Sequence, residues 1–487
     1  MKIFEGNSGN SVLLTIVKAF TTISGILSTM IMSHALSLEL YGTFSQTNLI
    51  VTTATNLTAL GLVDAVNYFY NRSNDEKFQR AYINTIIGLQ MIIGIIAGIL
   101  IIALSNGLIG YFNNPMLSSF FWLIAFRPLF ANLNVSLQYL QVSIGRVKSV
   151  MMRNAGFASL RLIVYIVAAW VLKDITIILI AFLTFEVIIT MSFGWTFAKE
   201  KFTIMPYRIN WNKTKEILWY SIPMGIYVLT NSLCRDIDKM LIGGWYNTDQ
   251  YAIYANCATL LPFDIVSTSF LTVLVPILTR YFGERDYAHG RILFKNYLKI
   301  GYYTAFTFTA ACMILSKEMV LFLYGEKYLS GQPIFILYTI VDMVKFANMS
   351  IVLSASGQTK TLMTCSLVAL IANAGCNVLF YHIFGFIGPA IATVFVTVIL
   401  TAILAKMSAQ SLKTSIWNLI DWKDFLAFVI ELAVLGTICF AAKCALELFA
   451  INSIITLCVL GSAYILCIFL LNKNKIFTAM QEINALH

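Results

Sequence analysis

Apolar runs about twenty residues long recur from one end of this sequence to the other, each long enough to cross a hydrocarbon layer about 30 Å thick as an α-helix. Hydrophobic residues make up 59% of the 487 residues and charged residues only 11%, which is too much apolar surface for one water-soluble core. The sequence therefore predicts an all-α integral membrane protein with about fourteen transmembrane helices.

Glycine, proline, asparagine and clusters of charge separate the runs and set the expected helix boundaries. The connections are short, so no extramembrane domain is left to house an active site. The expected helices are residues 11–33, 41–70, 80–104, 117–142, 149–171, 174–197, 215–243, 249–279, 294–316, 331–356, 360–382, 386–407, 424–442 and 450–471.

Basic residues are distributed unevenly over the predicted loops. Of the 33 lysines and arginines, 22 fall in the termini and the even-numbered loops, four fall in the odd-numbered loops, and seven lie inside helices. Since basic loops stay on the cytoplasmic side, we predict that both termini are cytoplasmic. The net charge of +10 then reflects topology, and we expect no nucleic-acid partner.

Cysteines and histidines give no sign of a metal centre. The nine cysteines lie in or beside apolar runs without a Cys-x-x-Cys pair, and the four histidines are isolated. Phosphate-binding glycine loops and nucleophile elbows are also missing. We expect no metal, no resident cofactor and no catalytic residue.

Two short motifs recur at nearly equal offsets. The segment at Tyr41 returns at Tyr251, 210 residues later, and the segment at Gly145 returns at Gly357, 212 residues later. Equal offsets indicate an internal duplication of six helices. The prediction is an N-terminal lobe (1–198), a cytoplasmic linker (199–214), a C-terminal lobe (215–408), and two additional helices with a cytoplasmic tail (409–487).

Several of these motifs carry a family resemblance over nearly the whole chain. The segments 38–44 (LELYGTF), 235–243 (RDIDKMLIG) and 276–279 (PILT), with the loops at 145–148 and 357–360, resemble the polysaccharide-transporter branch of the multidrug/oligosaccharidyl-lipid/polysaccharide (MOP) exporter superfamily. The resemblance implies two six-helix lobes around a central cavity that opens to either face in turn. It also implies an undecaprenyl-pyrophosphate-linked oligosaccharide as substrate and the bacterial cytoplasmic membrane as location.

Basic side chains inside the predicted helices are candidates for substrate contacts, because a charge at bilayer depth must face protein or water. Arg127 and Arg161 lie near the middle of their helices, and Arg127 precedes Pro128, whose missing N–H loosens the helix. The prediction is a cationic cavity lined by Arg127, Arg161, Lys18 and Lys345. Lys18 is also placed to reach the headgroups, and Lys345 to pair with Asp342 three residues earlier.

Two further groups of charged residues lie in the helices. Arg235, Asp236, Asp238 and Lys239 balance one another near one end of helix 215–243, which favours a gate or a charge network. Asp264, Asp64, Glu186 and Asp342 are candidates for binding a proton or Na⁺ that drives transport. Asp264 leads this group because it follows Pro262 inside a helix.

Three functions other than flipping a lipid-linked oligosaccharide stay open. Multidrug efflux of cationic amphiphiles fits the same architecture but calls for acidic lobes. An integral-membrane enzyme such as a polysaccharide polymerase needs a large outer loop or a polar motif. A scaffold would not need so many charges in the membrane. The expected partners are the lipid-linked substrate, membrane lipid and polysaccharide polymerase machinery.

Overall fold

The computed structural model describes residues 7–72, 75–199, 202, 209–263, 265–449 and 451–485, with side chains except at 7–16, 18, 198–199, 265–273 and 484–485. These residues form helices and contain no strand, which confirms the predicted all-α class. The chain divides into two compact units, residues 1–252 and 253–487.

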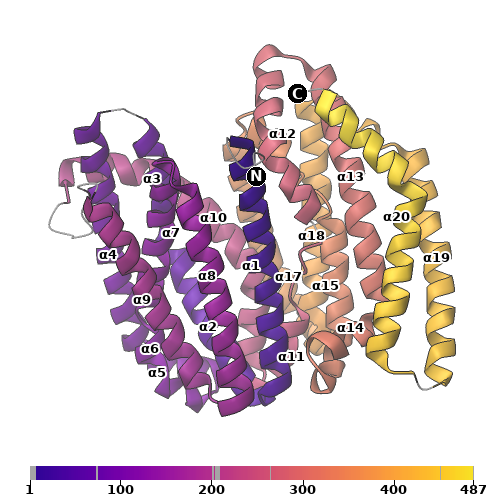
Figure 1. The fold of residues 1–487 in the computed structure, drawn as a ribbon, viewed down its shortest axis with the longest axis horizontal. Helices are drawn as coiled ribbons and strands as arrows, with labels where there is room; N and C mark the ends of the chain where they lie inside the picture. The colour runs from indigo at the N-terminus through magenta and orange to yellow at the C-terminus, as the bar shows by residue number, and fades with distance from the viewer. Residues whose placement is uncertain are drawn as a thin grey trace. The chain divides into compact units, whose positions relative to one another are not determined.

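The first unit contains the helices drawn in indigo to magenta in Figure 1. Its core lies among α3, α4, α7, α9 and α10, where side chains such as Phe69, Ile83, Leu137, Phe193 and Ile217 are fully buried. The elements are α1 (Asn7–Ala35), α2 (Leu38–Ala59), α3 (Leu62–Asn71), α4 (Glu76–Ala103), α5 (Ser105–Phe112), η2 (Pro115–Ser119), α6 (Phe121–Ile124), α7 (Arg127–Ser143), α8 (Val147–Tyr165), η3 (Ile166–Leu172), α9 (Ile175–Lys199) and α10 (Trp211–Trp245).

The second unit continues from α11 (Thr248–Cys257), which crosses the boundary between the units. Figure 1 shows α19 and α20 side by side at the yellow end, and α20 also packs against α13. Its elements are α12 (Ile265–Glu284), α13 (Tyr287–Ile314), α14 (Ser316–Leu323), η5 (Glu326–Gly331), α15 (Gln332–Val344), α16 (Ile351–Ala355), α17 (Thr359–Phe384), η6 (Gly385–Ile387), α18 (Gly388–Ser411), η7 (Ile416–Asn418), α19 (Trp422–Leu448) and α20 (Ser453–Ala485).

Four of the expected helices are broken. The predicted helix 41–70 is interrupted at Leu60 and Gly61, which both have left-handed backbone angles. A Cβ on Gly61 would lie 2.0 Å from the carbonyl oxygen of Ser221, so the turn depends on glycine. Helices 117–142, 249–279 and 331–356 are likewise interrupted, before α7, between α11 and α12, and between α15 and α16.

Many helices are long and apolar enough to cross a membrane, so the chain is a multi-pass membrane protein. The described residues contain eight such stretches, or nine if the pair α13 and α14, bent by 87°, counts as one span. One stretch, Thr359–Ser411, includes two of the expected helices. The total of fourteen and the lobe boundaries at 198, 215 and 408 stay predictions. Helix α10, expected in the C-terminal lobe, packs against α2, α3 and α4 of the first unit.

Candidate functional site

A polar cavity of about 270 Å³ lies within the first unit, between α1, α7, α8 and α9. It brings together three of the charged residues that the sequence singled out, Arg127, Arg161 and Glu186. The other side chains that line it are Thr21, Asn154, Phe157, Ala158, Phe182, Phe185 and Ile189. This cavity is the candidate functional site.

Arg127 is placed in the cavity by a break in the helical path. The short helix α6 ends at Ile124, and α7 begins at Arg127 with Pro128 in its first turn. Proline is tolerated there because the first N–H groups of a helix have no intrahelical partner. The break that the sequence predicted at Arg127 is thus present, and it sets the guanidinium at the start of a helix.

The Arg127 guanidinium is almost buried and is held from three sides. Its Nη2 lies 3.1 Å from Oε1 of Glu186 in an ion pair, and its Nη1 donates to Asn48 Oδ1 at 3.4 Å. The guanidinium also lies 5.0 Å from the ring centroid of Phe182. Burial strengthens such a pair and makes each partner costly to remove.

Glu186 lies on the continuous helix α9, where hydrogen bonds to its backbone carbonyl oxygen hold it in place. Its carbonyl oxygen accepts hydrogen bonds from the Asn134 side chain at 3.2 Å and from the Thr190 hydroxyl at 2.7 Å. The Thr190 hydroxyl also lies 2.7 Å from Asn134 Oδ1 and shares its one hydrogen between the two oxygens, so α7 and α9 are joined beside the carboxylate. The position of Glu186 opposite Arg127 is therefore set by a polar contact between two helices.

Arg161 differs from Arg127, since no described residue makes a hydrogen bond or an ion pair with its guanidinium. It lies on α8 one turn before the π-helical segment η3, a local widening that often occurs at functional sites. The described lining thus holds two arginines and one glutamate. A cavity with one uncompensated guanidinium can receive an anion, and arginine binds phosphate or carboxylate through two parallel hydrogen bonds.

The other two members of the predicted cationic cavity, Lys345 and Lys18, stay predictions. Lys345 ends α15 in the second unit, and the carboxylate of Asp342 on the same helix accepts a hydrogen bond from the Leu261 N–H at 2.9 Å. Lys18 lies on α1, and its side chain is outside the described residues, as is the whole of Asp264. Asp64 lies on α3, away from the cavity lining.

The predicted charge network near the end of α10 forms within that helix. Asp236 lies 3.7 Å from Nε of Arg235 and 3.6 Å from Nζ of Lys239. Asp238 is buried and accepts a hydrogen bond from the Lys239 N–H at 2.8 Å. Asp236 is therefore compensated within its own helix, and the role of this group as a gate or charge network stays a prediction.

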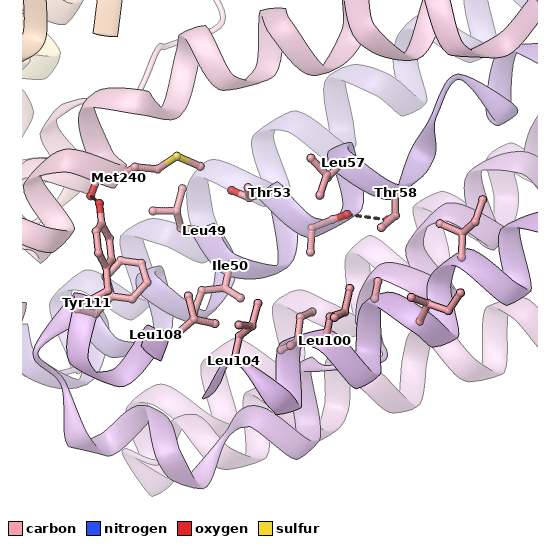
Figure 2. Close-up of a pocket in the computed structure, with 16 residues that line it drawn as sticks. Leu49, Ile50, Thr53, Leu57, Thr58, Leu100, Leu104, Leu108, Tyr111 and Met240 are labelled. Atoms are coloured by element: carbon pink, nitrogen blue, oxygen red, sulfur yellow. Dashed lines mark hydrogen bonds between the residues drawn. The ribbon is translucent and has the colours of Figure 1, made fainter. Parts of the chain in front are cut away.

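A larger cavity of about 580 Å³ in the same unit has the opposite chemistry. Figure 2 shows Leu49 and Leu57 of α2 facing Leu100 at the far end of α4, with Tyr111 and Met240 at one end. The Tyr111 hydroxyl donates to the Met240 carbonyl oxygen at 2.9 Å, and none of the described residues that line the cavity is charged. This apolar groove suits hydrocarbon and offers nothing that would recognise a charged headgroup.

The second unit contains two ion-pair clusters that were not predicted from the sequence. Lys443, which directly follows the expected helix 424–442, is nearly buried on α19 and lies 2.8 Å from Glu318 on α14. Asp424 on α19 is contacted by Lys299 at 3.2 Å and by Lys475 at 3.0 Å. Both clusters join elements that are far apart in the chain, and their one sequence signal was a charge next to an apolar run.

Comparisons with known proteins agree with this architecture. The polysaccharide biosynthesis protein family matches residues 31–333, well over half of the chain. A probable lipid II flippase MurJ from Rickettsia prowazekii (strain Madrid E) is 26% identical over 156 residues, which cover 29% of this chain and 29% of the relative. The sequence match thus spans less than a third of that relative's length.

Solved structures share the fold across most of the chain. The lipid II flippase MurJ in an inward closed conformation has a TM-score of 0.76 at 16% identity, with 96% of this chain and 100% of that chain covered. An inward-facing multidrug resistance MATE family transporter of the MOP superfamily has a TM-score of 0.69 at 13% identity, covering 81% of this chain and 94% of the other. The chain belongs to the polysaccharide biosynthesis protein family and has the fold of the MOP-superfamily transporters.

Proposed function

We propose that this protein is a flippase that moves an undecaprenyl-pyrophosphate-linked oligosaccharide from the inner to the outer leaflet of the bacterial cytoplasmic membrane by alternating access. The observation that carries the proposal is Arg161, a guanidinium without a described partner, beside the Arg127–Glu186 pair in one polar cavity. The product would serve surface polysaccharide synthesis, in line with the family to which the chain belongs.

A pyrophosphate headgroup matches this arrangement chemically. Two guanidinium groups in a partly dehydrated cavity can each donate two hydrogen bonds to phosphate oxygens, and the low local dielectric strengthens them. Arg161 would make the first contact, since its donors are available. Arg127 would follow if the phosphate competes with Glu186 for its guanidinium.

The second cavity supports an amphiphilic substrate. Asn48, which accepts a hydrogen bond from Arg127, directly precedes Leu49 and Ile50, which line the apolar groove. Helix α2 therefore separates a cationic cavity from a hydrocarbon-like one within a single unit. A lipid with a charged head and a long tail needs both kinds of surface.

Several finer points belong to the same proposal. Glu186 is the favoured site for coupling to a proton or Na⁺, because it and the substrate phosphate would both bind the Arg127 guanidinium. Further candidates are Asp64, Asp264 and Asp342. Arg235, Asp236, Asp238 and Lys239 would act as a gate. Both termini would lie in the cytoplasm, and polysaccharide polymerase machinery would be a partner.

The decisive experiment is deletion of the gene in its native host, followed by complementation with wild type, Arg161→Ala or Arg153→Ala. Arg153 is a matched control on the same helix, because it donates to Thr196 at 3.2 Å and lies outside the cavity. We expect surface polysaccharide to be lost on deletion and restored by wild type and Arg153→Ala. Arg161→Ala should restore less than a tenth, since a hydrogen bond to a charged group contributes about 1.5–3 kcal/mol.

The same strains separate this function from efflux of cationic drugs. Normal surface polysaccharide in the deletion strain, together with greater susceptibility to cationic drugs, would falsify the flippase proposal. Full restoration by Arg161→Ala, at wild-type protein level, would instead reject the cationic cavity as the headgroup site. Immunoblots of membrane fractions supply the protein levels.

A further inference from the structure

Helix α3 has two faces of different character. Leu62, Ala65, Val66 and Phe69 are fully buried in the core of the first unit. Asp64, Asn67 and Tyr68 recur at helical spacing on the other face, where Asn67 and Tyr68 are exposed and Asp64 is half-buried. This polar and aromatic face has no role in the cavity that holds Arg127 and Arg161.

The depth of Asp64 makes that face unusual. The apolar span Leu38–Asn71 ends seven residues beyond Asp64, which places its carboxylate about 10 Å inside the span. No described residue donates a hydrogen bond to this carboxylate or forms an ion pair with it. A charge at this depth does not face lipid, so Asp64 faces water or a ligand.

Tyrosines from three helices surround this carboxylate. Tyr68 of α3 stacks on Tyr220 of α10 with ring centroids 4.0 Å apart and planes inclined by 14°. Tyr139 of α7 is 43% exposed, and both it and Tyr220 lie within electrostatic range of Asp64. Helix α3 packs against α7 and α10 within the first unit (Figure 1). The three rings therefore come from neighbouring helices.

The surface is held in place before any ligand binds. The Ser143 hydroxyl donates to Asn67 Oδ1 at 3.2 Å and so joins α7 to α3. Arg72, at the end of α3, forms an ion pair with Glu216 of α10 at 2.5 Å, one turn before Tyr220. Preorganised side chains lose little freedom on binding, which favours affinity.

We infer that Asp64, Asn67, Tyr68, Tyr139 and Tyr220 form a carbohydrate-binding surface. A pyranose ring offers apolar C–H faces that pack on aromatic rings, and hydroxyl groups that donate to a carboxylate and exchange hydrogen bonds with phenols and amides. The inference rests on the proposed function, because it places the sugar of the lipid-linked substrate on this surface while the arginines hold the pyrophosphate.

The charges around the surface favour a neutral sugar over an ion. Asp64 repels phosphate, so the surface does not duplicate the cavity at Arg161. The Arg72 guanidinium already lies 5.9 Å from the ring centroid of Tyr68, which weakens the attraction of that ring for a second cation. Neutral hydroxyl groups have neither disadvantage.

The test measures binding of two kinds of lipid to the purified full-length protein in detergent micelles. The probes are undecaprenyl pyrophosphate and the same lipid bearing one N-acetylglucosamine, glucose, galactose or mannose. The variants are Asp64→Asn and Tyr68→Leu, with Trp122→Leu as a control, because Trp122 is an exposed aromatic residue (71%) of the same unit that lines neither cavity. Gel filtration and thermal unfolding verify that each variant is folded.

We expect wild type and Trp122→Leu to bind at least one sugar-bearing lipid five-fold or more tightly than undecaprenyl pyrophosphate. Asp64→Asn and Tyr68→Leu should reduce that ratio to about one and leave the affinity for undecaprenyl pyrophosphate unchanged. Arg161→Ala should weaken both lipids equally. If Arg161→Ala leaves the affinity for both kinds of lipid unchanged, the proposed binding of pyrophosphate by Arg161 is wrong. The ratio of the two affinities still tests the carbohydrate-binding surface.

Three results would overturn the inference. The first is a sugar preference that Asp64→Asn and Tyr68→Leu both retain. The second is a wild-type protein that binds all five lipids equally. The third is a loss of tetraphenylphosphonium binding in Asp64→Asn with the sugar preference intact, which would make this surface a cation site.

Discussion

The two units use the same kinds of charged residue in opposite ways. In the second unit, Lys443 and Glu318 are 9% and 2% exposed and form a closed pair at 2.8 Å, with the lysine also donating to the Ile314 carbonyl oxygen. In the first unit, Arg127 pairs with Glu186 in an open cavity that is also lined by Arg161. A sealed pair fixes helices to each other, whereas an incomplete set of partners leaves donors for a ligand.

The largest effect should come from breaking the sealed pair. Lys443→Met leaves the Glu318 carboxylate buried without its cation, and we expect a loss of about 3–5 kcal/mol in the free energy of unfolding. Denaturation of the purified protein in mixed micelles measures the change. The double variant Glu318→Leu/Lys443→Met should recover most of the stability, because an apolar pair of similar size carries no buried charge. A double variant as unstable as Lys443→Met would show that the pair has a role beyond its charge.

The second cluster of the second unit should be next in size. Asp424 accepts hydrogen bonds from Tyr302 at 2.9 Å and Tyr303 at 2.8 Å and pairs with Lys299 and Lys475, so it joins α13, α19 and α20. Asp424→Asn keeps the shape but removes the charge, and we expect a loss of about 1.5–3 kcal/mol. The same denaturation assay reports it. An unchanged midpoint would mean that the terminal helices are held by apolar packing alone.

The sequence identified the charges of the first unit better than those of the second, for a physical reason. Arg127, Arg161 and Glu186 each interrupt a long apolar run, so their cost in lipid marks them at once. Lys443 follows the expected helix 424–442 by one residue, where a lysine is normal at the membrane surface. Only the packing of α14 against distant parts of the chain buries it.

The pairing of the charges and the break at Leu60 and Gly61 were beyond the reach of the sequence. That Glu186 meets Arg127 while Arg161 stays open depends on how α7, α8 and α9 pack, which hydropathy does not specify. The turn at Leu60 and Gly61 lies in an apolar run where a glycine is ordinarily tolerated. Its cause is the close approach of α10, since a Cβ on Gly225 would lie 2.4 Å from the Leu60 carbonyl carbon.

An intermediate effect should come from removing the carboxylate that pairs with Arg127 in the first unit. Glu186→Gln removes the anion that competes for Arg127, so both guanidinium groups become available to phosphate. We expect affinity for undecaprenyl pyrophosphate to rise about tenfold, equivalent to about 1.4 kcal/mol. Binding to the purified protein in micelles measures it, with Arg153→Ala as the unchanged control. Weaker binding in Glu186→Gln would mean that Glu186 positions Arg127 for the ligand instead of competing with it.

The smallest effect should come from a pair that lies next to the sealed one but in solvent. Lys317 and Glu447 join the same two helices, α14 and α19, at 3.2 Å, yet their side chains are 47% and 44% exposed. Exposed pairs contribute about 0–1 kcal/mol, because water and salt screen the charges. Lys317→Met should therefore shift the unfolding midpoint several times less than Lys443→Met in the same assay. Equal shifts would show that burial is not what separates structural from ligand-binding charges in this chain, and the contrast between the two units would lose its basis.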